Sequence, residues 1–414
     1  DQQTPQQPGD PGLPGPQPGR TPDQDVQPVV DVPVEPGLRY TETIESGADG
    51  HPVRYCRLVG DEDTRVGELE VHSFRWRFGA VSVAAEGIGG VEIQPRFRRR
   101  GNMGKLLRRA LDGMSRRVDV ATVSDGIQGV YEKFGFVTSV AEGHLLVRLR
   151  DIERAATAVP PAGEITRPGS TDDLPAIASL YNATHARRPW THERPAGWNR
   201  LVRRTTWRPG SEVLVVESDG SDGKVTGYAI VAGRSFGDSR FSLIVEEMAA
   251  DSVGAARRLL SDIARSAWQM RIGEFTVREP LDSLVGRLAR HLGCTYEQEF
   301  PPTGGMMAAI LNRPGLLAKL QPELRRRDGG DAAGHGEGNG GKRGVPAVPA
   351  VADHADAVLA ELSRGELISD DRLLIRLLLG YSSAADAPML GTVIPERYRR
   401  IFSEWFPGGG SARL

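Results

Sequence analysis

Cysteine is nearly absent from this chain of 414 residues, which has only Cys56 and Cys294, far apart in the sequence. So small a number favours a reduced protein over one that disulfides hold together. The chain also lacks any run of about eighteen or more apolar residues, and its amino-terminal end is polar and rich in proline, so neither a membrane span nor a signal peptide is predicted. We therefore expect a cytoplasmic protein with no membrane partner.

An excess of charge of one sign is missing as well. The 52 Lys and Arg residues nearly balance the 54 Asp and Glu residues, which leaves a net charge of -2. A chain this close to neutrality gives no electrostatic argument for a nucleic-acid partner, and none is expected. The 8 histidines show no spacing typical of metal ligands, so we expect no metal either.

What the chain does contain begins with a polar arm. Residues 1–37 are rich in Pro, Gly and Gln and have few apolar side chains, so they cannot offset the entropy lost on ordering, and we expect them to be disordered. From there on, strand-like runs end at Gly and Asp turns, as in an antiparallel meander. These runs cover residues 39–45, 51–60, 67–78 and 79–93.

After residue 101 the hydrophobic period changes from that of a strand to that of a helix. The apolar residues at helical spacing are Met103, Leu106, Leu107, Ala110, Leu111 and Met114. A buried strand over residues 118–124, a short helix over 127–134 and a strand over 143–150 follow. We interpret residues 38–150 as one compact unit of mixed helix and strand.

A second unit, predicted over residues 163–303, partly repeats this order. It opens with a capping box at Ser170 and Asp173 and continues with a hairpin, a strand and a long helix. A third unit over residues 304–414 ends in an amphipathic helix. The residues predicted to form the buried face of that helix are Tyr398, Ile401, Phe402 and Trp405. The predicted fold class is α+β, with a diverged second copy of the first unit.

The string VEIQPRFRRRGNMGKLL, residues 91–107, carries the most specific chemistry. A strand runs into an arginine-rich turn, and a helix begins at Gly101. Such a turn presents several backbone N–H groups together with the positive end of the helix dipole, and Arg98, Arg99 and Arg100 add positive charge at its rim. This combination is typical of a pyrophosphate site. The alternative is a basic, solvated entrance to a helix.

Strand, glycine-containing turn, helix, strand and the string YEKFGF occur in the order typical of the GNAT acetyltransferase superfamily. The turn resembles its RxxGxG/A signature, with Arg98, Gly101 and Met103 at the marked positions, although Met103 replaces the usual small residue. More closely, PRFRRRGNMGKLL resembles the turn of the enhanced intracellular survival (Eis) family of N-acetyltransferases. That resemblance implies two tandem GNAT-like units, the second degenerate, and a sterol-carrier-like carboxy-terminal unit.

The resemblance implies acetyl-CoA as the cosubstrate and assigns its contacts residue by residue. Backbone groups of Val91, Glu92 and Ile93 would pair with the pantetheine arm. The pyrophosphate would be held by Arg99, Arg100, Gly101, Asn102, Met103 and Gly104. Ser124 and Asp125 would lie beside the cofactor, and for these two a helix cap is the alternative.

Tyr131 in YEKFGF matches the tyrosine that protonates the departing thiolate in such enzymes. A phenol keeps its proton near neutral pH and can donate it to the charge that develops on sulfur. A core tyrosine is the alternative. The resemblance also implies that the terminal carboxylate, here that of Leu414, acts as general base. Because this tail lacks the aromatic end usual in that family, Glu70 or His72 is an alternative base that acts through water, and a structural role is the alternative for both.

Together these patterns predict an N-acetyltransferase that acts on an amine acceptor, which could be an aminoglycoside, a polyamine or a lysine side chain. The alternative function is a non-catalytic scaffold that binds acyl-CoA or a lipid. The second unit has no arginine run before Gly254 and no equivalent of Tyr131, so we expect it to bind no cofactor. The resemblance further implies a homo-oligomer, either a trimer or a hexamer.

Overall fold

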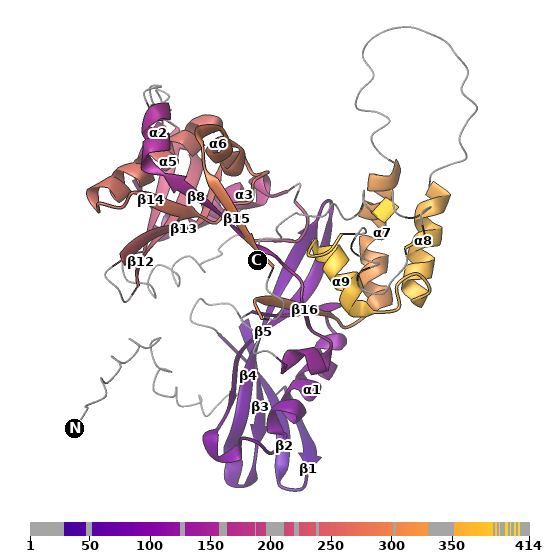
Figure 1. The fold of residues 1–414 in the computed structure, drawn as a ribbon. Helices are drawn as coiled ribbons and strands as arrows, with labels where there is room; N and C mark the ends of the chain where they lie inside the picture. Colours follow the sequence, from indigo (N-terminus) through magenta and orange to yellow (C-terminus); the bar gives the residue numbers. More distant parts are fainter. Residues whose placement is uncertain are drawn as a thin grey trace, which may run out of the picture. The chain divides into compact units, whose positions relative to one another are not determined.

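The structure is a computed structural model with two compact parts, each with its own sheet (Figure 1). We call residues 28–143, 178–198 and 297–414 the first-sheet unit, and residues 144–177 and 199–296 the second-sheet unit. The residues that the structure describes are 29–46, 52–124, 129–156, 164–186, 188–195, 211–218, 223–236, 240–300, 304–329 and 352–383, with separate positions between 386 and 405.

The first sheet is an antiparallel meander with one parallel pair. Its strands, in order across the sheet, are β1 (Val30–Glu35), β2 (Leu38–Ser46), β3 (Pro52–Val59), β4 (Arg65–Phe78), β5 (Val81–Ile93), β6 (Val120–Ser124), β16 (Met306–Ile310) and β7 (Val137–Thr138). In addition, β10 (Thr191–His192) pairs with β4. The parallel pair is β5 and β6, and the chain between them forms η2 (Pro95–Phe97) and α1 (Asn102–Ser115).

Two hydrophobic cores lie on opposite faces of this sheet, because successive side chains of a strand point to opposite faces. On β4, Leu69 and Val71 pack into one core, whereas Trp76 and Phe78 pack into the other. The apolar stripe of α1 covers the first of these faces (Figure 1). Its fully buried apolar side chains are those of Leu106, Leu107, Ala110 and Met114.

The core on the second face is completed by the carboxy-terminal helices α7 (Arg313–Gly329), α8 (Ala352–Arg364) and α9 (Asp371–Leu379). The predicted buried face of the last helix is confirmed. Its four apolar side chains, at most 7% exposed, are those of Tyr398, Ile401, Phe402 and Trp405. The carboxy-terminal segment is therefore part of the same layered unit as the meander.

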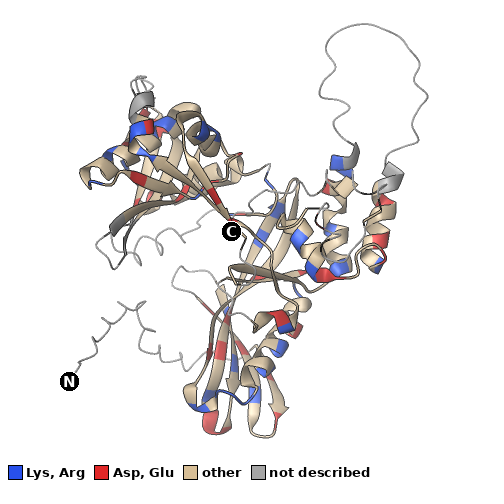
Figure 2. Ribbon diagram, in the orientation of Figure 1, with Lys and Arg blue, Asp and Glu red and all other residues tan. Residues whose placement is uncertain are grey.

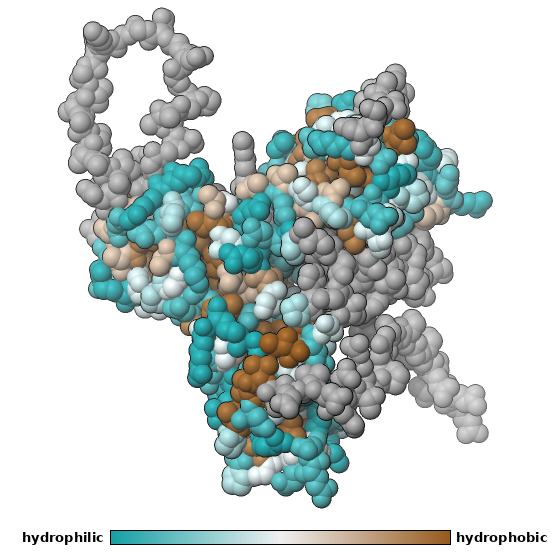
Figure 3. Space-filling view, turned by 180° about the vertical axis from the view of Figure 1, so that it is seen from behind, coloured by the Kyte–Doolittle hydropathy of each residue, from teal (hydrophilic) through white to brown (hydrophobic). Residues whose placement is uncertain are grey.

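The second sheet repeats the plan of the first. Its strands, in order, are β15 (Thr295–Glu299), β8 (Glu142–Arg148), β14 (Glu274–Val277), β13 (Arg240–Ala250), β12 (Val225–Phe236), β11 (Ser211–Ser218) and β9 (Glu164–Pro168). β13 and β14 are parallel, and α5 (Val253–Gln269) connects them as α1 connects β5 and β6. The other helices of this half of the chain are α2 (Leu149–Ala156), α3 (Leu174–Thr184) and α6 (Leu284–Leu292). On the face shown in Figure 3, each unit has apolar surface, in brown, among its hydrophilic residues.

Each sheet takes a strand from the other half of the sequence. β8 lies at the end of the first predicted unit but pairs with β14 in the second sheet. β16 follows the second predicted unit but pairs with β6 in the first sheet. The predicted boundaries at residues 150 and 303 therefore do not separate the two sheets, because the two copies exchange a strand.

Most local predictions agree with the structure, and two differ. The meander, the helix after residue 101 and the capping box at Ser170 and Asp173 are present. Val30–Glu35, assigned to the disordered arm, form β1, because alternate valines pack on the core. Of the short helix predicted over 127–134, the described residues 129–134 contain a single turn of 3₁₀ helix, η3 (Tyr131–Phe134), which Gly135 ends with φ 89. None of the helices described here is long and apolar enough to traverse a bilayer.

Candidate active site

The parallel strands of the first sheet separate at one end. β5 pairs with β6 from Ala85 to Ile88, and β6 ends at Ser124. β5 continues through Gly89–Ile93. Along this stretch β4 pairs with one edge of β5, and no strand among the described residues pairs with the other edge. A strand without a second neighbour leaves backbone N–H and C=O groups available to a ligand. We call Gly89–Ile93 the open edge.

Strand alternation decides which residues face outward from the open edge. The Gln94 N–H donates to a carbonyl of the β4 strand at 3.0 Å, so its backbone points toward β4. Glu92, two residues earlier, points the same way, whereas Val91 and Ile93 point outward. Arg98 already uses one outward group, because its Nε donates to the Ile93 C=O at 2.8 Å. Of the three residues predicted to pair with pantetheine, two have outward backbone groups left for hydrogen bonds to a ligand: the N–H and C=O of Val91 and the N–H of Ile93. The backbone groups of Glu92 point to β4 instead.

The turn from β5 into α1 adopts a conformation that most residues avoid. Arg99 has φ 61 and Gly101 has φ 75, both in the left-handed region. A Cβ at Gly101 would meet no atom within 4 Å, so the backbone conformation, not crowding, favours glycine here. Gly101 is the N-cap of α1 and provides no side-chain cap. The first N–H groups of α1 therefore have no partner within the helix and can bind an anion.

Arg99 and Arg100 are exposed and directly precede these N–H groups, as predicted. The next two side chains have structural roles. Asn102 is buried, and its Nδ2 donates to the Phe97 C=O at 3.0 Å, which fixes the turn. Met103 packs against the core beneath α1. At Asn102 and Met103, backbone groups are therefore what a phosphate could contact.

Tyr131 begins η3, which packs against the first turn of α1. A Cβ on Gly104 would lie 3.8 Å from the Phe134 ring, an ordinary contact distance, so η3 lies directly beside this turn of the helix. Tyr131 is 4% exposed and meets the Phe136 ring edge to face, with ring centroids 6.0 Å apart. Burial raises the pKa of Tyr131 above its ordinary value, so its hydroxyl keeps its proton at neutral pH. Tyr131 is thus a core residue and also a protonated donor near α1.

Ser124 lies at the end of β6, where β5 and β6 separate. Opposite it stands Met306 of β16, and the Ser124 Oγ donates to the Met306 Sδ at 3.8 Å. Sequence reasoning missed Met306, because it lies 182 positions away and was assigned to the third unit. Asp125 and Leu414 lie outside the described residues, so their assigned roles stay predictions.

Glu70 and His72 lie beside the open edge as a hydrogen-bonded pair. The His72 Nε2 is 3.0 Å from the Glu70 Oε2. A Cβ on Gly89 would lie 3.5 Å from the His72 Nε2, and a Cβ on Gly90 would lie 3.2 Å from the Glu70 carboxyl carbon. The two side chains are 40% (His72) and 31% (Glu70) exposed, so solvent reaches both. The structure thus brings the alternative base residues together at the open edge.

The corresponding helix start in the second sheet already holds an anion. The Ser252 Oγ caps α5 by accepting from the Ala255 N–H at 3.0 Å, and it donates to the Glu164 Oε1 at 3.2 Å. A Cβ on Gly254 would lie 2.9 Å from the same Glu164 oxygen. A carboxylate this close to the start of α5 would repel a phosphate there. Sequence reasoning missed Glu164 because it lies on β9, 88 positions before Ser252.

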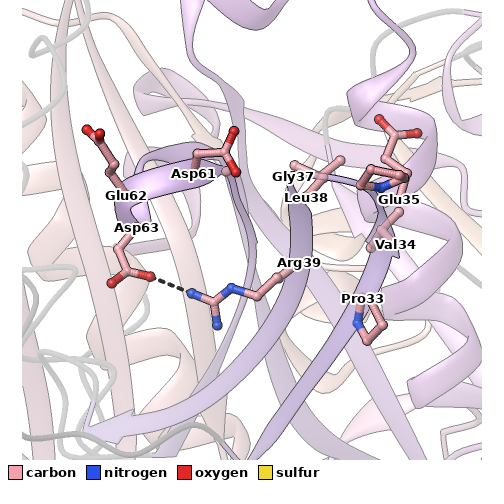
Figure 4. Close-up of a pocket in the computed structure, with 11 residues that line it drawn as sticks. Pro33, Val34, Glu35, Gly37, Leu38, Arg39, Asp61, Glu62 and Asp63 are labelled. Carbon is pink, nitrogen blue, oxygen red and sulfur yellow. Dashed lines mark hydrogen bonds and ion pairs between the residues drawn. The ribbon is translucent and has the colours of Figure 1, made fainter.

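A hollow of about 700 Å³ lies between the β1–β2 turn and η1 (Asp61–Asp63) (Figure 4). Asp61, Glu62 and Asp63 contribute three carboxylates to this hollow, and all three are labelled in Figure 4. Arg39 pairs with Asp63 and, at 2.5 Å, with Asp31. No predicted site residue lines this hollow, so it does not belong to the candidate active site. Within the described ranges, no group of three or more His, Cys, Asp or Glu side chains is arranged to hold a metal ion.

Comparison with known proteins identifies the domain that carries the open edge. The sequence model of the acetyltransferase (GNAT) domain family matches residues 34–138, which contain β2 to β6, α1 and Tyr131. The chain is also 30% identical over 177 residues to an uncharacterized N-acetyltransferase from Streptomyces avermitilis. That match covers 41% of this chain and 42% of the relative. The predicted resemblance to GNAT acetyltransferases is confirmed.

Solved structures show a similar fold over a larger part of the chain. Eis1 from Mycobacterium abscessus is similar with a TM-score of 0.54 and 15% identity, over 87% of this chain and 90% of that one. A GCN5-related N-acetyltransferase from Anabaena variabilis is similar with a TM-score of 0.50 and 18% identity, over 64% of each chain. At these identities the likeness shows the fold alone, and it confirms the predicted α+β arrangement with two sheets.

Proposed function

Since this chain carries a GNAT acetyltransferase domain at residues 34–138, we propose that it transfers the acetyl group of acetyl-CoA to an amine. The observation that carries the proposal is the grouping of three features in the first-sheet unit. These are an open strand edge, a helix start that no side chain caps, and a buried tyrosine that keeps its proton. An aminoglycoside, a polyamine or a lysine side chain is the proposed acceptor.

The residues present fit acetyl-CoA. Backbone groups of Val91 and Ile93 would bind the pantetheine arm as an added strand does, because they point outward from the open edge. The N–H groups at the start of α1 would bind the pyrophosphate, with Arg99 and Arg100 adding positive charge. The φ of 75 at Gly101 and the space beside it support this assignment. Ser124 and Asp125 would lie beside the cofactor where β6 ends.

We assign His72 as the general base. The bond to Glu70 keeps the proton of the neutral imidazole on Nε2, so the lone pair is on Nδ1. Nδ1 can then take the proton of the amine, directly or through water, as the nitrogen attacks the thioester carbon. The C–N bond forms, the C–S bond breaks, and Tyr131 donates its proton to the sulfur. The carboxylate of Leu414, which the family resemblance suggests, is the alternative base.

We also propose that the second-sheet unit binds no cofactor. Glu164 supports this proposal, because its carboxylate lies where a pyrophosphate would have to bind. A sterol-carrier-like carboxy-terminal segment, which belongs to the first-sheet unit, would help to shape the acceptor pocket. A homo-oligomer, built on trimers, is the proposed assembly.

Turnover of Tyr131→Phe tests the function and the acid together. Purified protein is assayed for coenzyme A thiol released from acetyl-CoA in the presence of polyamines, aminoglycosides or lysine-rich peptides. We expect the variant to bind acetyl-CoA and to melt as the wild type does, while kcat falls about 10²-fold or more. Tyr181→Phe is the matched control, because Tyr181 is also buried but lies on α3. No turnover by the wild type with any acceptor class would contradict the function, whereas a fully active Tyr131→Phe would contradict only the assignment of the acid.

A further inference from the structure

A second hollow, of about 1220 Å³, lies within the second-sheet unit. Three chain segments form it: the end of β8 with the start of α2, the end of α5, and the start of β14. Backbone bonds hold these segments together, because Arg148 pairs with Glu274 in the sheet and the Leu149 N–H donates to the Gly273 C=O at 3.1 Å. The hollow is therefore part of the rigid frame of the unit, and nothing in the proposed transfer reaction uses it.

Trp268, on the last turn of α5, lines this hollow and is 67% exposed. The apolar residues on the inner face of the same helix, such as Leu260 and Ile263, are buried. An indole carries one of the largest apolar surfaces of any side chain, and proteins bury most of it. Trp268 therefore offers a flat aromatic surface that packing within its own unit does not use.

Arg271 lines the same hollow in a conformation that normally selects glycine. It follows the end of α5 and has φ 58. That left-handed position closes the helix, because the next residue, Ile272, donates its N–H to the Ala267 C=O at 2.9 Å. A side chain at such a position makes the fold less stable than glycine would. Where a strained residue persists, a role for its side chain is the natural hypothesis.

The charge of the hollow is positive. It is lined by Arg148, Arg150 and Arg271 against the single carboxylate of Glu274. Arg148 lies 3.9 Å from Glu274, and both side chains are about half exposed, so water screens this pair. Among the residues described, no carboxylate lies within ion-pair distance of Arg271. The basic residues of this unit are blue in Figure 2.

We propose that this hollow binds a nucleoside phosphate. The base stacks on Trp268, and the phosphates pair with Arg148, Arg150 and Arg271. Guanidinium groups match the geometry of phosphate oxygens, and every nucleobase has a face that stacks on an aromatic ring. Small-ligand sites typically measure roughly 300–1,000 Å³, so a hollow of about 1220 Å³ is large enough for one nucleotide. The residues that line the hollow come from three short segments and do not form an extended basic stripe, which a nucleic-acid strand would need. This favours a single nucleotide as the ligand.

The test is calorimetric titration of ADP into the full chain at low salt. The chain that is titrated carries Arg99→Ala and Arg100→Ala, because the proposed active site would also accept a nucleotide and coenzyme A, itself an adenine nucleotide, could occupy the hollow. We expect one ADP per chain and an affinity that falls with salt. Trp268→Leu and Arg271→Gly should each weaken binding about tenfold or more. Arg265→Ala is the matched control, since Arg265 is an exposed residue of α5 outside the hollow and should leave ADP binding unchanged.

Arg271→Gly also separates a ligand role from a structural one. Because glycine relieves the left-handed strain, this variant should melt about 2–4 °C higher while it binds ADP less tightly. Equal ADP binding by the wild type, Trp268→Leu and Arg271→Gly would overturn the proposal. So would tighter binding of a ten-nucleotide strand than of ADP. A lower oligomer mass for Trp268→Leu would overturn it as well, because Trp268 would then be a subunit contact.

Discussion

Glu323 on α7 offers a sharp test of how the carboxy-terminal segment is joined to the catalytic sheet. Its side chain is 0% exposed and accepts hydrogen bonds from Arg326 at 2.7 Å, from Arg327 at 2.9 Å and from the Ala80 N–H at 3.2 Å. The carboxylate sits directly on the β4–β5 turn, where a Cβ on Gly79 would lie 2.1 Å from it. Glu323→Gln keeps the shape of the side chain and removes its charge.

The expected size follows from the pKa of Glu323. Burial alone would raise this pKa, but the hydrogen bonds from Arg326, Arg327 and Ala80 outweigh burial and lower it from 4.5 to about 2. At roughly 1.36 kcal/mol per pKa unit, the charged form contributes about 3 kcal/mol to the free energy of unfolding. Because the folded pKa lies below the unfolded one, the contribution is complete above pH 4.5 and is lost as the pH falls from 4.5 to about 2.

Denaturant unfolding at several pH values, followed by tryptophan fluorescence, measures this contribution. The core around α7 contains three buried tryptophans, Trp76, Trp190 and Trp405, which report its unfolding. We expect Glu323→Gln to lose about 3 kcal/mol at pH 7, and the difference from the wild type to shrink steadily below pH 4.5. The matched control is Glu366→Gln, which removes the same charge from a pair with Arg364 at 2.7 Å.

The control isolates burial. The Glu366 side chain is 54% exposed and that of Arg364 is 57% exposed, so water screens their ion pair and it should contribute little to stability. If Glu323→Gln and Glu366→Gln lose the same stability at pH 7, burial does not strengthen the Glu323 pair. If the loss at Glu323 is large but does not change with pH, the stabilisation comes from shape and hydrogen bonding, and the reasoning from its charge is wrong.

Two further predictions concern the cofactor. Gly101→Ala should weaken coenzyme A binding about tenfold, because alanine resists φ 75. Gly223→Ala is the control, because Gly223 has φ 52 and also lies in open space, so this variant should lose similar stability without a change in affinity. Calorimetry measures the affinities of the two variants, and melting curves measure their stability. Arg99→Ala combined with Arg100→Ala should weaken binding more at low salt than at high salt, with one coenzyme A bound per wild-type chain. Two coenzyme A sites per chain that persist in Trp268→Leu would mean that Glu164 does not block the second-sheet unit.

The parts of the fold that could be predicted are those whose signals are contiguous in the chain. The strand period up to residue 93, the helical period after residue 101 and the capping box at Ser170 and Asp173 each depend on neighbours within one or two turns. The turn before α1 could be predicted for the same reason, since its arginines, its glycine and its helix are adjacent. Glu70 and His72, the alternative bases, lie side by side because residues two apart on a strand share a face.

Contacts between distant segments could not be predicted in this way. Nothing in the local pattern of Glu164 shows that it lies on the start of α5, because that contact exists only once β9 has joined the second sheet. The same holds for Arg98, predicted as part of the charged rim, whose Nε instead binds the Ile93 carbonyl. A side chain's nearest partner depends on tertiary structure, and one sequence does not specify it.

The exchange of β8 and β16 is the clearest case, and it bears on the site. Both are short apolar strands, and each could cover the edge of either parallel strand, β6 or β14, so hydrophobic pattern alone leaves the pairing open. With β16 in the first sheet, Met306 stands opposite Ser124, where β5 and β6 separate. The wall of the open edge beyond β6 thus comes from chain that follows the second copy. The first sheet is therefore complete only after the chain has passed through the second copy, which takes β8 from the first copy and leads back to β16.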